Sequence, residues 1–134
     1  MSIDEIGYWP EVDGAPDPGE VVWAWVPYEE DATQGKDRPV LLIGRRTSEG
    51  REQWLGLMLS SQDHDLDADD EARYGRHWMD VGSGDWDSEG RPSEVRLDRL
   101  LVLEADAVRR EGAVLARATF DAVVAEARRF LSVT

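Results

Sequence analysis

The chain has 134 residues, no cysteine, and a formal net charge of −14 from 29 acidic and 15 basic side chains. This length fits one domain with its own core, and the lack of cysteine excludes disulfides and thiolate metal sites. The negative charge argues against broad, sequence-independent nucleic-acid binding, which needs many cations to neutralise phosphates, but it leaves room for a local cationic groove.

Residues 1–17 are predicted to form an acidic N-terminal arm, because they are rich in Asp, Glu, Gly and Pro and show no periodicity. The opening MSIDEIGYWPEVDG has neither the basic nor the apolar region of a signal peptide. No apolar run approaches the roughly 20 residues of a membrane helix. We therefore expect a cytoplasmic protein without a membrane segment, in which a single domain over residues 18–134 follows the arm.

Four segments in the first two thirds of the chain have the composition of β-strands. Residues 19–28 (GEVVWAWVPY) are β-branched and aromatic, and Pro27 ends this strand or marks a sheet edge. Residues 39–45 (PVLLIGR) form a short apolar run that is typical of a central strand. Residues 53–61 (QWLGLMLSS) predict a third strand, and residues 77–84 (HWMDVGSG) predict a fourth.

The last third of the chain predicts a strand, a turn and a helix. Residues 94–104 (EVRLDRLLVLE) alternate at first and then become apolar, which indicates one long strand. A helical turn closed by Gly112 and a short strand are expected next. Apolar residues then recur at helical spacing from Phe120 to Leu131, with Thr119 as the expected N-cap. The fold class expected is mainly β with one C-terminal amphipathic helix.

An acidic stretch lies between the third and fourth predicted strands, with six acids over residues 63–71. Asp63, Asp65 and Asp67 have the spacing of the first EF-hand ligands. However, Ala68 and Tyr74 stand where that loop needs a glycine and a bidentate Glu. The pattern therefore predicts no calcium loop, and leaves either generic cation binding or a solvated loop.

The two histidines, His64 and His77, are each candidates for a general base near neutral pH, but no partner stands at a supporting spacing. The chain has no Cys-His pair, nucleophile elbow, phosphate-binding loop or dinucleotide fingerprint.

Arginines and hydroxyls at the predicted strand ends are the remaining chemical candidates. Pro39 biases Arg38 toward extended backbone, so the backbone aims this side chain. Ser60 closes the third strand, and Arg96 and Asp98 share one strand face at i and i+2. An arginine can hold a developing phosphorane charge, and a carboxylate can exchange a proton. The alternative is a surface Arg96–Asp98 pair and an Arg38 that caps a loop.

Three quoted segments resemble the PemK/MazF family of toxin endoribonucleases, in the family's order and over roughly residues 17–131. PGEVVWAWVPYEEDATQGKDRPVLLIG resembles its opening, in which an Arg-Pro pair leads into an apolar strand. LMLSSQ resembles its strand that ends in Thr-Ser, and SEVRLDRLLVLEAD resembles its strand with an Arg and an Asp two residues apart. Pro18 and Glu20 depart from the family's leading basic residue and Asp.

The resemblance implies a small SH3-like β-barrel with a C-terminal helix, assembled as a homodimer. It also implies cleavage of single-stranded RNA at short motifs, without metal or other cofactor, by attack of the 2′-hydroxyl to leave a 2′,3′-cyclic phosphate. The expected partner is a cognate antitoxin whose acidic tail covers the RNA groove.

The resemblance also assigns roles to individual residues. Arg38 would stabilise the phosphorane or act as the acid, Ser60 takes the place of a catalytic threonine, and Arg96 with Asp98 matches an acid–base pair. The predicted catalytic residues are Arg38, Ser60, Arg96 and Asp98, and the predicted RNA contacts are Ser61 and Gln62.

Two other functions stay open from the sequence. One is a non-catalytic SH3-like member that binds a protein, either inactive or masked by the acidic stretch 63–71. The other is a gyrase poison of the CcdB type, for which the end of the chain, residues 132–134, would matter. The aromatic candidates for stacking on RNA bases are Trp25, Tyr28, Trp78 and Trp86, with core packing as the alternative.

Overall fold

The computed structural model describes residues 18–28, 31–60, 77–87 and 89–131. The predicted N-terminal arm, the predicted RNA contacts Ser61 and Gln62, His64 and the acidic stretch 63–71 lie outside these residues.

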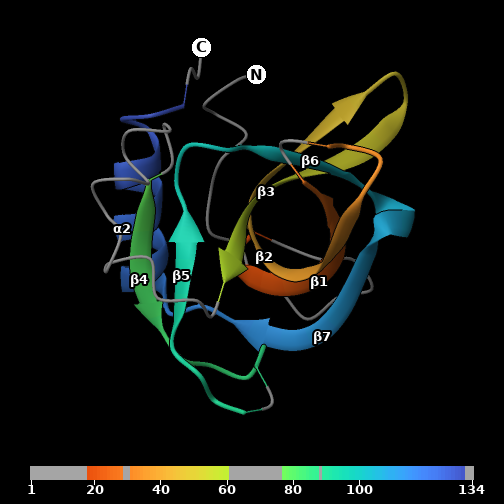
Figure 1. Cartoon of the computed structure of the whole chain (residues 1–134). Helices are drawn as coiled ribbons and strands as arrows, with labels where there is room; N and C mark the ends of the chain where they lie inside the picture. Colours follow the sequence, from red (N-terminus) through yellow and green to blue (C-terminus); the bar gives the residue numbers. More distant parts are fainter. Residues whose placement is uncertain (1–17, 29–30, 61–76, 88, 132–134) are drawn as a thin grey trace.

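The described residues form a mainly β structure with one C-terminal helix, which confirms the predicted fold class (Figure 1). A short 3-10 helix, η3 (Ala105–Ala107), precedes the last strand, and the helix α2 (Arg117–Ala127) follows it. The strands are β1 (Glu20–Pro27), β2 (Gly35–Ser48), β3 (Arg51–Ser60), β4 (Trp78–Gly82), β5 (Ser93–Arg96), β6 (Leu101–Glu104) and β7 (Val108–Val114).

The strands pair antiparallel in the order β4-β5-β3-β2-β1-β7, with β6 also paired to β3. β1, β2, β3 and β7 curl around one side of the molecule, while α2 lies beside β4 and β5 (Figure 1). Among the described residues, β4 and β7 stand at the two ends of the strand order and do not pair with each other. Closure into a barrel therefore stays a prediction.

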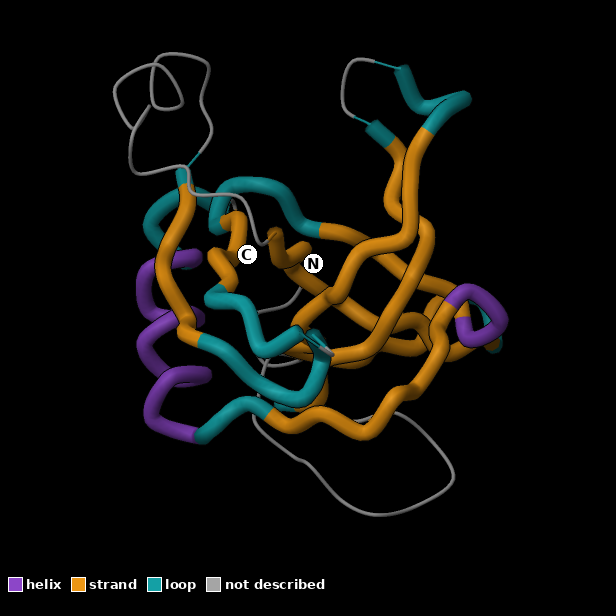
Figure 2. The backbone as a smooth tube through the Cα atoms, turned by 60° about the horizontal axis from the view of Figure 1, so that its bottom comes forward, coloured by secondary structure: helices purple, strands orange, loops and turns teal. Residues whose placement is uncertain are grey.

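β2 and β3 are longer than their apolar runs and form a hairpin whose turn projects at the upper right of Figure 1. In Figure 2, the arm that rises at the upper right is formed by β1 and β2 instead. The pairing runs from Val40 opposite Met58 out to Ser48 opposite Arg51. Polar residues extend the strands here because the backbone groups that face the neighbouring strand pair across the hairpin.

The single long strand expected over residues 94–104 is instead two strands, β5 and β6. Both pair with β3: Val95 lies opposite Leu59, and Leu101 lies opposite Gly56. Five residues, 96–100, therefore stand opposite only two residues of β3, so the chain must leave the ladder between β5 and β6. We call residues 97–100 the β5–β6 bulge.

Alternate residues of the central strands enter two hydrophobic clusters, one on each face of the sheet. Leu41 and Leu57 belong to the first cluster, and Val40 and Met58 belong to the second. The helix supplies the first cluster with the apolar positions predicted from its periodicity, which are Phe120, Val123, Val124 and Ala127.

The helix begins at Arg117, two residues before the expected N-cap. Ala116 holds the cap position and makes no side-chain cap hydrogen bond, so Thr119 is a helical residue instead. Packing of the apolar face, rather than a polar cap, therefore fixes where the helix starts. No helix in the described ranges is long and apolar enough to cross a membrane.

Candidate active site

A cleft of about 430 Å³ opens where the ends of β2 and β3 meet the segment between β4 and β5. We call it the Arg38 cleft. Its polar lining includes Lys36, Asp37 and Arg38 from β2, Ser60 from β3, and Asp87 and Arg91 from the segment between β4 and β5.

Arg38 and Ser60 meet in this cleft because β2 and β3 are neighbours. Val40 pairs with Met58, and the same register carried two residues further places Arg38 opposite Ser60. Pro39 and Leu59 also line the cleft, so it takes in the ends of both strands. The structure thus brings together an arginine and a hydroxyl that lie 22 residues apart in the sequence.

The guanidinium of Arg38 is partly withdrawn from water, and this burial lowers its pKa from the usual arginine value. The nearby Tyr28 opposes that effect, whereas the positive charge of Arg99 adds to it. An arginine keeps its charge at neutral pH even so. Arg99 is itself held in place, since its Nη2 donates a hydrogen bond to the Pro27 carbonyl at 2.7 Å. Arg38 therefore brings a permanent positive charge to the cleft in a partly desolvated position.

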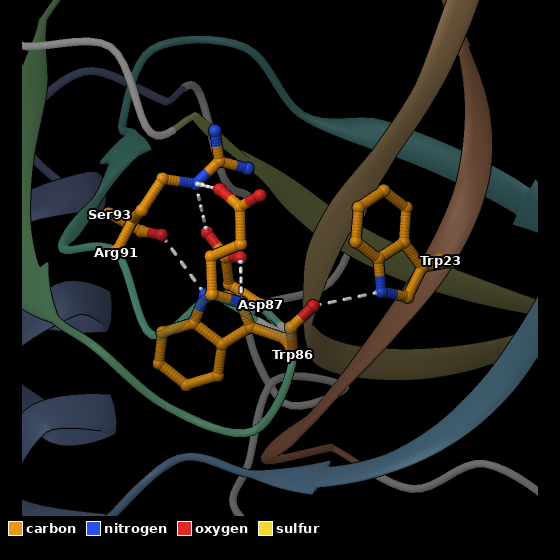
Figure 3. Close-up of polar contacts among 6 residues, drawn as sticks. Trp23, Trp86, Asp87, Arg91 and Ser93 are labelled. Carbon is orange, nitrogen blue, oxygen red and sulfur yellow. Dashed lines mark hydrogen bonds and ion pairs between the residues drawn. The ribbon is translucent and has the colours of Figure 1, made fainter.

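The wall of the cleft opposite β2 is anchored by Trp86 (Figure 3). The indole of Trp86 is buried and donates from Nε1 to Ser93 Oγ at 3.0 Å, while its carbonyl accepts from Trp23 Nε1 at 3.2 Å. Gly84 makes room for this ring, because a Cβ at that position would lie 2.2 Å from a ring carbon of Trp86. These contacts fix the segment between β4 and β5 against β1.

An ion pair stands at the mouth of the cleft on the same wall. Arg91 Nε donates to Asp87 Oδ2 at 2.8 Å and lies 3.3 Å from Glu89 Oε2 (Figure 3). The pKa of the Asp87 carboxyl is lowered mainly by a hydrogen bond from the Glu89 backbone N–H, and further by the hydrogen bond from Arg91. Asp87 therefore stays ionised at neutral pH. Neither Asp87 nor Arg91 was predicted as a site residue, since an Asp and an Arg four apart in a turn-rich loop carry no distinctive sequence signal.

Arg96 and Asp98 contact each other but are not among the residues that line the Arg38 cleft. Arg96 Nε and Nη2 donate to the two carboxylate oxygens of Asp98 at 3.0 and 3.1 Å. Asp98 Oδ1 also accepts the His77 backbone N–H at 2.8 Å. The pair therefore joins β5 to the start of β4 at the β5–β6 bulge, and its acid–base role stays a prediction.

Two opposing effects act on the Asp98 carboxyl. Burial on its own would raise the pKa, but the hydrogen bonds from Arg96 and from the His77 N–H outweigh it, so the pKa is lowered. Asp98 is therefore an ionised and well-satisfied carboxylate at neutral pH. Such a carboxylate can stabilise the groups that donate hydrogen bonds to it, but its lowered pKa makes it a weak base.

The other sequence candidates occupy different places. The His77 ring stacks on Phe130 with the ring centroids 4.1 Å apart. Trp86 is buried and Trp78 packs against the second hydrophobic cluster, as the core-packing alternative predicted, whereas Trp25 is 49 % exposed. In the described part of the chain, no group of three or more His, Asp or Glu side chains is placed to hold a metal ion.

The comparison with protein families identifies the chain. A family model described as the PemK-like, MazF-like toxin of type II toxin–antitoxin systems matches residues 17–131. No match was found among the curated proteins. The matched region contains all the strands and the α-helix among the described residues, together with the Arg38 cleft. The chain therefore belongs to the PemK/MazF-like family of type II toxin–antitoxin toxins.

Proposed function

We propose that this toxin is an endoribonuclease that cleaves single-stranded RNA in the Arg38 cleft. The observation that carries the proposal is the placement of Arg38 opposite Ser60 in a cleft with further cations. Lys36, Arg38 and Arg91 supply three positive charges to the lining, against two carboxylates. In a chain with a net charge of −14, such a local excess favours a phosphate group at this place.

The proposed reaction breaks one phosphodiester bond and needs no outside oxidant or reductant. The 2′-oxygen of a ribose attacks the adjacent phosphorus, and the bond from phosphorus to the 5′-oxygen breaks. The 2′-hydroxyl gives up its proton and the leaving 5′-oxygen gains one, so the products are a 2′,3′-cyclic phosphate and a 5′-hydroxyl. Negative charge on the non-bridging oxygens rises in the transition state.

Arg38 is suited to stabilise that charge, because it brings a positive charge into the cleft from a restricted backbone and a partly buried position. Pro39 restricts its backbone, and partial burial strengthens its electrostatic effect. The Ser60 hydroxyl is suited to donate a hydrogen bond to the same phosphate. Arg96 and Asp98 are proposed to act on the reaction indirectly, by positioning the strand end that follows β5, since they pair with each other outside the cleft.

The family assignment implies a cognate antitoxin as partner. We further propose that the toxin acts in the cytoplasm as a homodimer, and that the antitoxin competes with RNA for the cations of the Arg38 cleft. An acidic antitoxin segment and an RNA backbone present the same charge to Arg38 and Lys36, so one cleft can serve both.

The test is cleavage of a long single-stranded RNA in EDTA and low salt, with cut sites mapped by primer extension and product ends analysed. Wild type is compared with Arg38→Ala and with the control Arg117→Ala, which removes an arginine from the exposed face of α2. We expect discrete cuts with cyclic phosphate ends for wild type and the control, and none for Arg38→Ala. Equal cutting by all three proteins would contradict the role of Arg38.

A non-catalytic binding member is the second candidate. It is favoured by one observation, the mutual neutralisation of Arg96 and Asp98 away from the cleft, which leaves the predicted acid–base pair without direct access to a substrate there. No cutting by a folded wild-type protein that still binds its antitoxin would support this function.

A further inference from the structure

We propose that Arg99 binds the phosphate that neighbours the scissile phosphate of the RNA, directly beside the Arg38 cleft. The proposal rests on the proposed function and adds to it a binding residue outside the catalytic set. Arg99 is not among the residues that line the cleft, so it would extend the RNA-binding surface beyond it.

Two contacts hold the guanidinium of Arg99 over the first half of β2. Its Nη2 donates a hydrogen bond to the Pro27 carbonyl at 2.7 Å, and its Nη1 lies 3.9 Å from the Met58 sulfur. Pro27 on β1 and Met58 on β3 are paired with the two ends of the stretch 35–40 of β2. Because β1 and β3 flank β2, a group that contacts both of them lies over this stretch, which contains Arg38.

Arg38 and Arg99 also lie on the same face of the sheet. Met58 and its partner Val40 belong to the second hydrophobic cluster. Arg38 stands two residues before Val40 on β2, and alternate residues of a strand share a face. The pKa of Arg38 reflects the closeness of the two guanidinium groups, because it is lowered by burial first and also by the charge of Arg99.

No carboxylate among the described residues neutralises these two arginines, since neither of them forms an ion pair there. The acidic side chain of the β5–β6 bulge, Asp98, accepts hydrogen bonds from Arg96 and from the His77 backbone N–H instead. In a chain with 29 acidic and 15 basic side chains, two neighbouring arginines without a carboxylate are unexpected. Arg38 and Arg99 therefore offer a local positive charge to a ligand.

The chemistry of the two arginines suits the backbone of a nucleic acid. Two like charges held close together repel each other, and a ligand with negative charges at a short repeat offsets that repulsion. A single-stranded RNA carries such a charge at every nucleotide, so one phosphate can lie at Arg38 and the next at Arg99. A guanidinium has five N–H donors in a planar fork that matches phosphate oxygens, so Arg99 can keep its bond to Pro27 and still bind a phosphate.

The experiment measures RNA affinity as a function of salt concentration. The probe is a fluorescein-labelled pool of short, mixed-sequence single strands with 2′-O-methyl groups throughout, which have no attacking hydroxyl, and the readout is fluorescence anisotropy. Arg99→Gln is expected to bind about 10- to 100-fold more weakly than wild type at low salt. The slope of log affinity against log salt should become flatter by about 0.7, the value for one lost phosphate contact on a single strand.

Two further variants separate the charge of Arg99 from its other properties. Arg99→Lys keeps the charge and is expected to keep the wild-type salt slope. Arg117→Gln removes the same charge from an exposed position on α2, so it serves as the matched control and is expected to bind like wild type.

A cleavage assay separates binding from catalysis. At saturating RNA, Arg99→Gln is expected to cleave within a few-fold of the wild-type rate, while the RNA concentration that gives half of this rate rises. A loss at saturating RNA as large as that of Arg38→Ala would instead place Arg99 in the catalytic set and overturn the binding role.

Four other results would also overturn the proposal. If Arg99→Gln matches wild type in affinity and slope while wild type still cleaves RNA, Arg99 binds no phosphate and the proposed function stands. If Arg99→Lys flattens the slope as much as Arg99→Gln, the hydrogen bond to Pro27 matters and the charge does not. If Arg99→Gln weakens binding of a labelled poly-Glu peptide but not of the RNA probe, the ligand is an acidic protein segment. If wild type neither binds nor cleaves RNA, the proposed function fails and the role of Arg99 fails with it.

Discussion

The free energy of unfolding lost in Asp98→Ala shows whether the Arg96–Asp98 ion pair stabilises the fold or is only a surface pair. Asp98 keeps 12 % of its side-chain surface exposed and its partner Arg96 keeps 4 %. The substitution removes the acceptor of two guanidinium N–H groups and of the His77 backbone N–H. All three donors come from β5 or the start of β4, so the loss concentrates where those strands join.

The expected cost is large because the pair is buried. Removing one partner of a buried ion pair costs about 3 kcal/mol or more of unfolding free energy, whereas an exposed pair contributes about 0.5 kcal/mol. We therefore expect Asp98→Ala to lose about 3 kcal/mol. Asp98→Asn keeps one acceptor oxygen and is expected to lose less, about 1 to 2 kcal/mol.

The same pair predicts how stability depends on pH. The pKa of Asp98 is lower in the folded protein than in the unfolded chain, so folding favours its ionised form. Its contribution is therefore complete above the ordinary Asp pKa of about 4 and is lost as pH falls through the lower folded-state value. The stability difference between wild type and Asp98→Asn should shrink in this acid range.

Urea unfolding at several pH values measures both effects. The control is Asp121→Ala, which removes an exposed carboxylate 3.7 Å from Arg117 and is expected to change stability by less than about 0.5 kcal/mol. If Asp98→Ala loses no more unfolding free energy than the control, or if its loss does not depend on pH, the Arg96–Asp98 pair does not stabilise the fold as proposed.

Two further substitutions test the packing that positions the cleft. Gly84→Ala should cost about 1 to 3 kcal/mol and alter the near-ultraviolet circular dichroism of Trp86, because the new Cβ would overlap its ring; an unchanged spectrum would contradict this. Val123→Ala, at a fully buried position on the inner face of α2, should cost about 2 kcal/mol in urea unfolding. Val114→Ala, at an exposed position on β7, should cost less than about 0.5 kcal/mol. Equal losses at the two valines would contradict the burial of the helix face.

The parts of the fold that follow local pattern were predictable from sequence. The apolar runs located the central strands, and the helical spacing of Phe120, Val123 and Val124 identified the face that α2 buries. The β5–β6 bulge was not predictable, because residues 97–100 contain neither glycine nor proline and the interruption arises only from how β5 and β6 both pair with β3. The start of α2 was misplaced for a similar reason, since tertiary packing fixes it in place of a polar cap.

Some residues of the candidate site could be predicted from the sequence, and others could not. Arg38 and Ser60 could be named from strand ends and from the family resemblance, and the β2–β3 register places them opposite each other. Arg96 and Asp98 were expected to share a face, and they do contact, but their distance from the cleft depends on the bulge. The positions of Asp87 and Arg91 depend on how the buried Trp86 packs. The exposure of Trp25 depends on its contact with Gly35. No local sequence pattern predicts either contact.

The most direct test of the central claim is the rate of RNA cleavage by Arg38→Ala and Arg38→Lys at saturating RNA, for proteins that unfold at the wild-type temperature. If Arg38 stabilises the charge of the transition state, Arg38→Ala should lose about 100- to 1,000-fold in rate. Arg38→Lys should recover part of that loss, because it restores the charge without the two-pronged geometry. A rate for Arg38→Ala within a few-fold of wild type would contradict the account and move the catalytic centre away from the Arg38 cleft.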